Sequence, residues 1–219
     1  MTASNANNTP LLSGLKAIAI IIVLSLWLFG LVLILTQTPF TNSTTPTLLL
    51  HTSSLFMLLL LVRVFKGQWV NDLAIHSSRF LYLIVAVFTG LVFWQTQQFI
   101  YTLLSPDTWQ QEALMWQKSQ IGFTLWSVFL ASCLIGPLLD ELLFRGLVYN
   151  QIKQKVGYIL ATVVSSGLFT LLHWDFTEAI WLFSAGVVYA MLREKSGSIW
   201  PAVIAHVIQN VLTFWLYVS

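Results

Sequence analysis

The sequence predicts an all-α membrane protein, a polytopic bundle of about seven transmembrane helices. Hydrophobic residues make up 57% of the 219 residues, charged residues make up only 8%, and the mean hydropathy is +0.80. An average soluble domain carries about 25% charged residues. Apolar segments approaching or exceeding the length that crosses a bilayer, about 20 residues, recur along the whole chain. This composition excludes an ordinary soluble domain and a disordered protein.

Seven apolar segments are the candidates for these helices. They cover residues 15–35, 48–64, 80–100, 121–149, 158–173, 179–192 and 199–217. Residues 1–14 are interpreted as a polar leader, residues 15–120 as three helices with their loops, and residues 121–219 as a four-helix core. The fourth segment is too long for a hydrocarbon layer of about 30 Å, because about 29 residues make roughly 43 Å of helix. Proline interrupts helical hydrogen bonding, so we expect a break near Pro137.

The positions of the basic residues predict how the chain is oriented. Seven alternating spans with a cytoplasmic amino terminus leave Lys118 as the basic residue outside and eight basic residues inside, namely Lys16, Arg63, Lys66, Arg79, Lys153, Lys155, Arg193 and Lys195. This excess agrees with the positive-inside rule. We therefore expect a multi-pass protein of the cell membrane, with the lipid bilayer as its first partner. The net charge of +2 is too small and too scattered for nucleic-acid binding.

Three of the late segments carry polar side chains that a bilayer makes costly. The motifs are Asp140-Glu141-Leu142-Leu143-Phe144-Arg145, Phe169 to His173, and His206-Val207-Ile208-Gln209-Asn210. Glu141 and Arg145 stand four residues apart, so they can pair along one helix. Counted from the inner basic residues, the three motifs reach overlapping depths in the membrane. We expect them to converge on one polar pocket, because each group then lowers the burial cost of the others.

These residue types suit hydrolysis of a peptide bond by an activated water molecule. A carboxylate and an imidazole form a general-base pair, and a second imidazole with a carboxamide can stabilise an oxyanion. The candidate catalytic residues are Asp140, Glu141, His173, His206 and Asn210, with Arg145 tuning the site. The residues do not decide which acid is the base. No cofactor is expected, although Glu141, His173 and His206 leave open a zinc site. Cys133, the one cysteine, is interpreted as a packing residue.

Taken in order, the three motifs resemble the CPBP family of intramembrane proteases, which includes CAAX prenyl protease 2 and the Abi proteins. The resemblance covers residues 121–217 and extends to Phe144-Arg145-Gly146, Ser165-Ser166 and the segment 196–200. It implies a glutamic-type endopeptidase with a peptide or membrane-protein substrate. By this resemblance the first acid and His173 activate water, His206 and Asn210 hold the oxyanion, and Glu141 and Arg145 shape the pocket. The short chain favours a prokaryotic source.

One departure from the family pattern keeps other functions open. The first acid is Asp140, where the family usually has glutamate, and a displacement of about 1 Å in a catalytic group can cost roughly a hundredfold in rate. The alternative is a non-catalytic bacteriocin-immunity or membrane scaffold protein on the same fold. A small transporter with Asp140, Glu141 and Arg145 along an ion path is a third hypothesis. It is disfavoured because transporters usually have matching broken helices in two halves.

Overall fold

The computed structural model describes residues 14–36, 45–104, 125–173 and 178–218, and this part of the chain is helical, with no strand. The all-α prediction is confirmed. The elements are α1 (Gly14–Thr36), α2 (Thr45–Val64), α3 (Trp69–Asp72), α4 (Phe80–Leu104), α6 (Leu125–Phe129), η2 (Leu130–Ile135), α7 (Gly136–Asp140), η3 (Glu141–Val148), α8 (Tyr149–Val156), α9 (Tyr158–Leu172), α10 (Ala179–Ser196) and α11 (Trp200–Val218).

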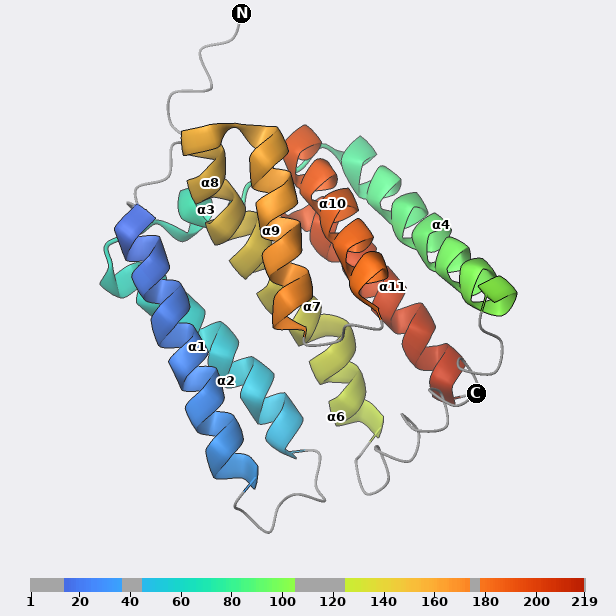
Figure 1. Ribbon diagram of the computed structural model, residues 1–219, viewed down its shortest axis with the longest axis horizontal. Helices are drawn as coiled ribbons and strands as arrows, with labels where there is room; N and C mark the ends of the chain where they lie inside the picture. The colour runs from blue at the N-terminus through green and yellow to red at the C-terminus, as the bar shows by residue number, and fades with distance from the viewer. Residues whose placement is uncertain (1–13, 37–44, 105–124, 174–177, 219) are drawn as a thin grey trace, which may run out of the picture.

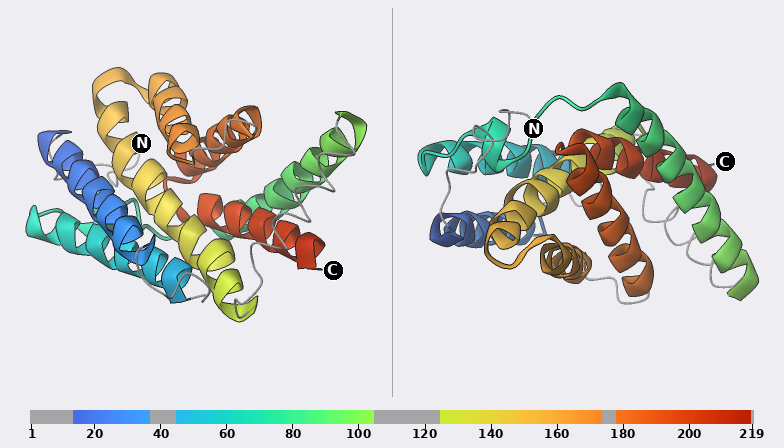
Figure 2. Two further views of the ribbon diagram at one scale, coloured as in Figure 1. Left: turned by 60° about the horizontal axis from the view of Figure 1, so that its bottom comes forward. Right: turned by 90° about the horizontal axis from the view of Figure 1, so that it is seen from above.

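The helices are arranged around one central rod, the run from α6 to α8. The helices α1 and α2 pack together on one side of this rod, and α11 packs along α4 on the other side (Figure 1). The helices α9 and α10 form a further antiparallel pair, which packs against the part of the rod that contains η3 and α8 (Figure 2). Successive long helices alternate in direction, as a chain that crosses a membrane repeatedly would require (Figure 1).

Three helical stretches in the described part are long and apolar enough to cross a membrane: Gly14–Ile34, Phe80–Leu103 and Leu125–Val156. Three shorter apolar helices cover Leu48–Val64, Tyr158–Leu172 and Trp200–Leu216. The helix α10 falls in neither group, and its last turns carry Arg193, Glu194 and Lys195. The count of seven spans therefore stays a prediction, and the expected leader lies almost wholly outside the described residues.

The expected break near Pro137 is wrong, because the rod runs as one helix from Leu125 to Val156. The π-helical stretches η2 and η3 flank α7, and Pro137 lies in the first turn of α7. The amide of Gly136 bonds to the carbonyl of Ala131, five residues back. The π-helical hydrogen-bond pattern accommodates the N–H group that proline lacks, and it leaves one carbonyl without a backbone partner. This arrangement disrupts the helix less than a break would.

Charged side chains gather at one end of the bundle, where α8 and α10 meet. Lys153 donates a hydrogen bond of 2.6 Å to Glu194 Oε2, and the Tyr149 hydroxyl donates one of 2.7 Å to the same oxygen. We call these three residues the basic-end cluster. Burial by itself raises the pKa of Glu194, but the hydrogen bonds from Lys153 and Tyr149 outweigh it, so the pKa lies below its usual value.

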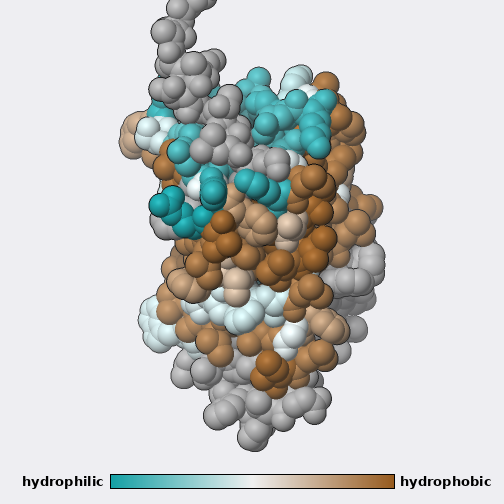
Figure 3. All heavy atoms as spheres, turned by 90° about the vertical axis from the view of Figure 1, so that its left-hand side faces the viewer, coloured by the Kyte–Doolittle hydropathy of each residue, from teal (hydrophilic) through white to brown (hydrophobic). Residues whose placement is uncertain are grey.

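The start of α1 lies at the same end. Lys16 Nζ donates to the carbonyl of Phe65, just after α2, at 3.2 Å. On the face that carries α1 and α2, hydrophilic residues lie at this end and hydrophobic residues cover most of the rest (Figure 3). This separation agrees with the expected basic side of the chain. Lys118 lies outside the described residues, and the orientation in the membrane stays a prediction.

The contact between α4 and α11 depends on a glycine. A Cβ atom at Gly90 would lie 2.8 Å from the carbonyl oxygen of Ala205 and 3.0 Å from Cβ of Ile208. The obstacle is backbone, which cannot move aside as the end of a flexible side chain can. The missing side chain therefore lets the two helices approach closely, as small residues do in membrane proteins.

We predict that Gly90→Ala destabilises the protein by about 1–3 kcal/mol, because the added methyl group overpacks this contact. Gly30→Ala is the matched control, since a Cβ there has nothing within 4 Å. Thermal unfolding in detergent, followed by tryptophan fluorescence, measures both. Equal unfolding temperatures for the two variants would show that α4 and α11 can move apart to accommodate the added methyl group without loss of stability.

Candidate active site

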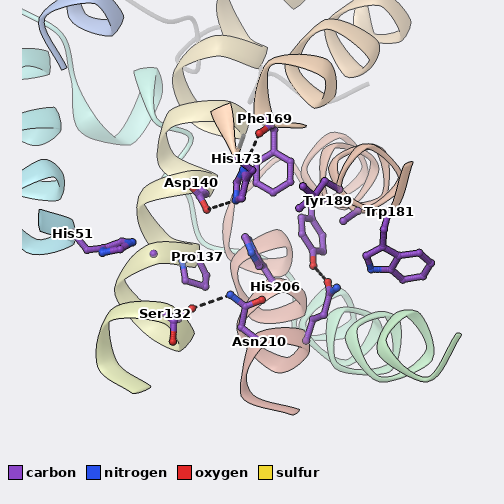
Figure 4. Close-up of a pocket in the computed structure, with 14 residues that line it drawn as sticks. His51, Ser132, Pro137, Asp140, Phe169, His173, Trp181, Tyr189, His206 and Asn210 are labelled. Carbon is purple, nitrogen blue, oxygen red and sulfur yellow. Dashed lines mark hydrogen bonds and ion pairs between the residues drawn. The ribbon is translucent and has the colours of Figure 1, made fainter. Parts of the chain in front are cut away.

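A cavity of about 270 Å³ lies where α7, α9, α10 and α11 meet, and one side chain of α2 reaches it (Figure 4). Its polar lining combines groups from five segments that are far apart in the sequence. The lining residues are His51, Ser132, Gly136, Pro137, Asp140, Phe169, His173, Trp181, Leu182, Ala185, Tyr189, His206, Gln209 and Asn210. The motifs singled out in the sequence thus meet at one hollow inside the bundle.

Asp140 and His173 face each other at this cavity. Oδ2 of Asp140 lies 3.8 Å from Nε2 of His173, and the two side chains are 24% and 33% exposed. Nδ1 of His173 lies 2.8 Å from the carbonyl oxygen of Phe169. A carbonyl only accepts, so this contact places a hydrogen on Nδ1 and leaves Nε2 as an acceptor in the neutral ring. Two acceptors therefore point toward one small region, at a separation beyond direct hydrogen-bond distance.

Glu141, the neighbouring acid, is buried behind the cavity wall and does not line it. Its side chain is fully buried, like that of Arg145, whose Nη1 donates to Glu141 Oε1 at 3.2 Å. Nδ1 of His206 lies 3.0 Å from the same oxygen. The expected pairing of Glu141 with Arg145 along the helix is therefore present. Because adjacent helical residues point about 100° apart, one acid faces the cavity and the other faces the protein interior.

Groups from several helices contact the guanidinium of Arg145. Nη2 donates to the carbonyl of Gly186 in α10 at 3.1 Å, and the guanidinium carbon lies 4.5 Å from the ring centre of Phe169 in α9. A buried ion pair costs several kcal/mol of desolvation per ion, which good geometry and further hydrogen bonds offset. These contacts of Arg145 therefore hold α9 and α10 against the central rod.

Asn210 completes the irregular helix beside the cavity. In the π register of η2, the carbonyl of Ser132 would pair with residue 137, which is a proline and has no N–H. Asn210 Nδ2 donates to this carbonyl at 2.8 Å instead. The sulfur of Cys133 donates to the carbonyl of Asn210 at 3.5 Å and is buried, as its interpretation as a packing residue requires. The carboxamide therefore satisfies the carbonyl that Pro137 leaves unpaired.

Of the candidate residues, the structure places Asp140, His173, His206 and Asn210 around the cavity, and Glu141 with Arg145 behind it. Sequence reasoning missed several further lining residues. They are His51, Trp181, Tyr189 and Gln209. His51 could have been singled out, because it is a histidine inside an apolar segment. The other three follow no spacing pattern in the sequence.

The zinc alternative needs Glu141, His173 and His206 to converge on one point. Among the described residues, no group of three His, Cys, Asp or Glu side chains is arranged to hold a metal ion. His173 faces Asp140, whereas His206 contacts the buried Glu141. The donors are therefore divided between two sites, and the expectation that no metal is needed stays a prediction.

Removing one partner of the buried pair should destabilise the protein strongly. We predict that Arg145→Met lowers the free energy of unfolding by about 3–5 kcal/mol, because Glu141 is left without its counter-charge. Lys153→Met is the matched control, since it breaks the partly exposed Lys153–Glu194 pair and should cost no more than about 1 kcal/mol. Denaturant unfolding in detergent compares the two. Similar losses for the two variants would contradict the strong stabilising role of the buried pair.

Comparisons with known proteins find similarity to membrane proteases in the part of the chain that carries the cavity motifs. Residues 122–212 match the family model described as Type II CAAX prenyl endopeptidase Rce1-like. The putative membrane peptidase YdiL of Bacillus subtilis is 26% identical over 83 residues, which cover 38% of this chain and 34% of that protein. The membrane-embedded CAAX protease MroQ of Staphylococcus aureus is 37% identical over 83 residues, which cover 35% of this chain and 34% of that protein.

The chain thus aligns with about a third of the length of each curated relative. No solved structure matches. The match to the family model covers the central rod, α9 and α10, and it ends within α11. It therefore includes every candidate residue of the cavity motifs. The part of the chain that carries the cavity motifs is therefore similar to the Rce1-like CAAX prenyl endopeptidase family and to membrane peptidases of two bacteria.

Proposed function

We propose that this protein is a membrane-embedded endopeptidase that uses water activated by Asp140 and His173. The observation that carries the proposal is the opposition of the Asp140 carboxylate and His173 Nε2 at the cavity, 3.8 Å apart. A water molecule between them can donate one hydrogen to each acceptor. The family match and the relatives named as membrane peptidases support the same reaction class.

In the proposed reaction, the water oxygen attacks the carbonyl carbon of the scissile peptide bond, and its proton passes to Asp140 or His173. The new C–O bond converts the carbonyl oxygen into an oxyanion. The same acid–base pair then returns the proton to the leaving nitrogen as the C–N bond breaks, which gives a carboxylic acid and an amine. Such positioned proton transfer contributes about 10²- to 10⁴-fold to a rate.

The oxyanion would be stabilised by His206 and Asn210, which line the cavity on α11. Nδ1 of His206 is directed to Glu141, so only Nε2 is left to serve the substrate. An ionised carboxylate accepts the Nδ1 hydrogen, and the ring can then donate from Nε2 only when it is doubly protonated. Asn210 uses one amide hydrogen on Ser132 and retains the second.

This assignment gives the two adjacent acids different roles. Asp140, at the cavity, is the base, and Glu141, buried with Arg145 and His206, is the counter-charge that holds His206 in place. The substrate would be a peptide or a segment of a membrane protein, since the cavity lies inside an apolar helix bundle. Neither a glutamic-type base at the first acidic position nor a metal ion is needed.

We predict that Asp140→Asn and His173→Gln each lower kcat by about 10²- to 10⁴-fold without loss of folding, because each removes an acceptor for the water. Asp140→Glu should retain more activity than Asp140→Asn, since it keeps a carboxylate. The measurement is cleavage of a fluorogenic peptide panel by purified protein in detergent. Glu194→Gln, in the basic-end cluster, is the control with the same loss of charge. Full activity in Asp140→Asn would reject Asp140 as the base.

A second prediction concerns metal removal. Dialysis against a strong chelator should leave the peptidase activity unchanged, because the proposed water activation uses only side chains. Inactivation that added Zn²⁺ reverses would favour the zinc alternative instead.

The non-catalytic alternative has one observation in its favour. The aspartate side chain at position 140 is one methylene shorter than the glutamate of the family pattern, and its carboxylate does not reach His173 directly. A protein with no cleavage of any peptide, as wild type and as Asp140→Glu, would support an immunity or scaffold role on this fold.

A further inference from the structure

A hydrogen-bonded chain of polar side chains joins the cavity wall to α4, a helix that lies outside the family motifs. The hydroxyl of Tyr189 in α10 donates to Oε1 of Gln209 in α11. Nε2 of Gln209 then donates to Oε1 of Gln97 in α4 at 3.2 Å. Tyr189 is 1% exposed and Gln209 is 8% exposed. We call these three residues the brace.

The brace ends on an imidazole of the candidate site. The ring of Tyr189 stacks on the ring of His206, with centroids 4.9 Å apart and planes inclined by 21° (Figure 4). Phe169 contacts the same imidazole edge-on, with centroids 6.0 Å apart. The contact of Nδ1 with Glu141 fixes one edge of the imidazole, and the rings of Tyr189 and Phe169 limit its rotation about that contact. The plane of His206 therefore depends on the plane of Tyr189.

The chemistry of the brace favours positioning over proton transfer. Gln209 accepts through its oxygen and donates through its nitrogen, and a carboxamide cannot pass a proton along without becoming an unstable tautomer. The Tyr189 hydroxyl needs a partner because it is buried, and a phenylalanine would fill the same space without one. The hydroxyl instead links Tyr189 by hydrogen bonds to Gln209 on α11 and, through Gln209, to α4.

The far end of the brace is itself held. Nε2 of Gln97 donates to the hydroxyl of Tyr101, one turn further along α4, at 3.4 Å. Tyr101 in turn donates to the carboxylate of Glu178, directly before α10. The polar groups thus link α4, α10 and α11, so displacing the Tyr189 hydroxyl would strain or break its bond to Gln209 on α11.

From this geometry we infer that Tyr189, Gln209 and Gln97 are positioning residues, which fix the imidazole plane of His206 at the cavity. The catalytic consequence rests on the proposed peptidase function, but the structural consequence does not. The helix α4, which carries no family motif, thereby becomes part of the machinery that orients the site.

The test compares Tyr189→Phe with Tyr149→Phe. Both remove the hydroxyl of a fully buried tyrosine that donates to a side chain, and Tyr149 belongs to the basic-end cluster rather than to the cavity. For the fluorogenic peptides, Tyr189→Phe should lower kcat by about tenfold, the effect of one lost hydrogen bond, with KM within about twofold. Tyr149→Phe should leave both unchanged. Gln97→Met, at the far end of the brace, should lower kcat in the same direction.

A second readout separates this inference from the proposed function. In protein labelled with ¹⁵N at its four histidines, the His206 ring signals are identified by their loss in His206→Gln. They should shift in Tyr189→Phe and Gln97→Met and stay in place in Tyr149→Phe. Unshifted signals in Tyr189→Phe would overturn the inference, whether or not peptides are cleaved. Shifted signals in a protein that cleaves nothing would keep the brace and reject the peptidase.

Discussion

The burial of Glu141 is the constraint on which the rest of this structure depends. A carboxylate without water is tolerated only where positive charge and hydrogen-bond donors surround it. Arg145 provides the charge from the next turn, and His206 provides a ring nitrogen from α11. Arg145 then needs partners of its own, which it finds in the Gly186 carbonyl and the ring of Phe169. The contacts of one buried acid and its counter-charge therefore join α9, α10 and α11 to the central rod.

The irregular hydrogen bonding of the rod serves the same site. The π-helical stretches on both sides of α7 let the chain accommodate Pro137 without a break, and they set the directions in which Asp140 and Glu141 point. The unpaired carbonyl of Ser132 that results is the partner of Asn210. Backbone irregularity is tolerated inside a membrane bundle where it is buried in protein or lines a cavity, and here it does both.

The proposed chemistry follows from a division of labour between neighbouring side chains. Asp140 and His173 remain accessible to water and substrate, whereas Glu141 and Arg145 are sealed behind them and act only through His206. The brace adds a second constraint on His206 from the opposite direction, through the stacked ring of Tyr189. A group that must meet a developing charge benefits from being held before the reaction, since no reorganisation is then needed.

The sequence by itself determined the helical class, the membrane character, the Glu141–Arg145 pairing and the three motifs, because hydrophobic composition and helical spacing are local properties. It did not determine which acid faces the cavity, since helical periodicity shows only that adjacent residues differ in direction. The continuity of the helix at Pro137 depended on a π register, and the recruitment of His51, Tyr189, Gln97 and Gln209 depended on contacts between distant helices. Those features arise from packing, where each side chain's surroundings come from other segments, and only the tertiary structure decided them.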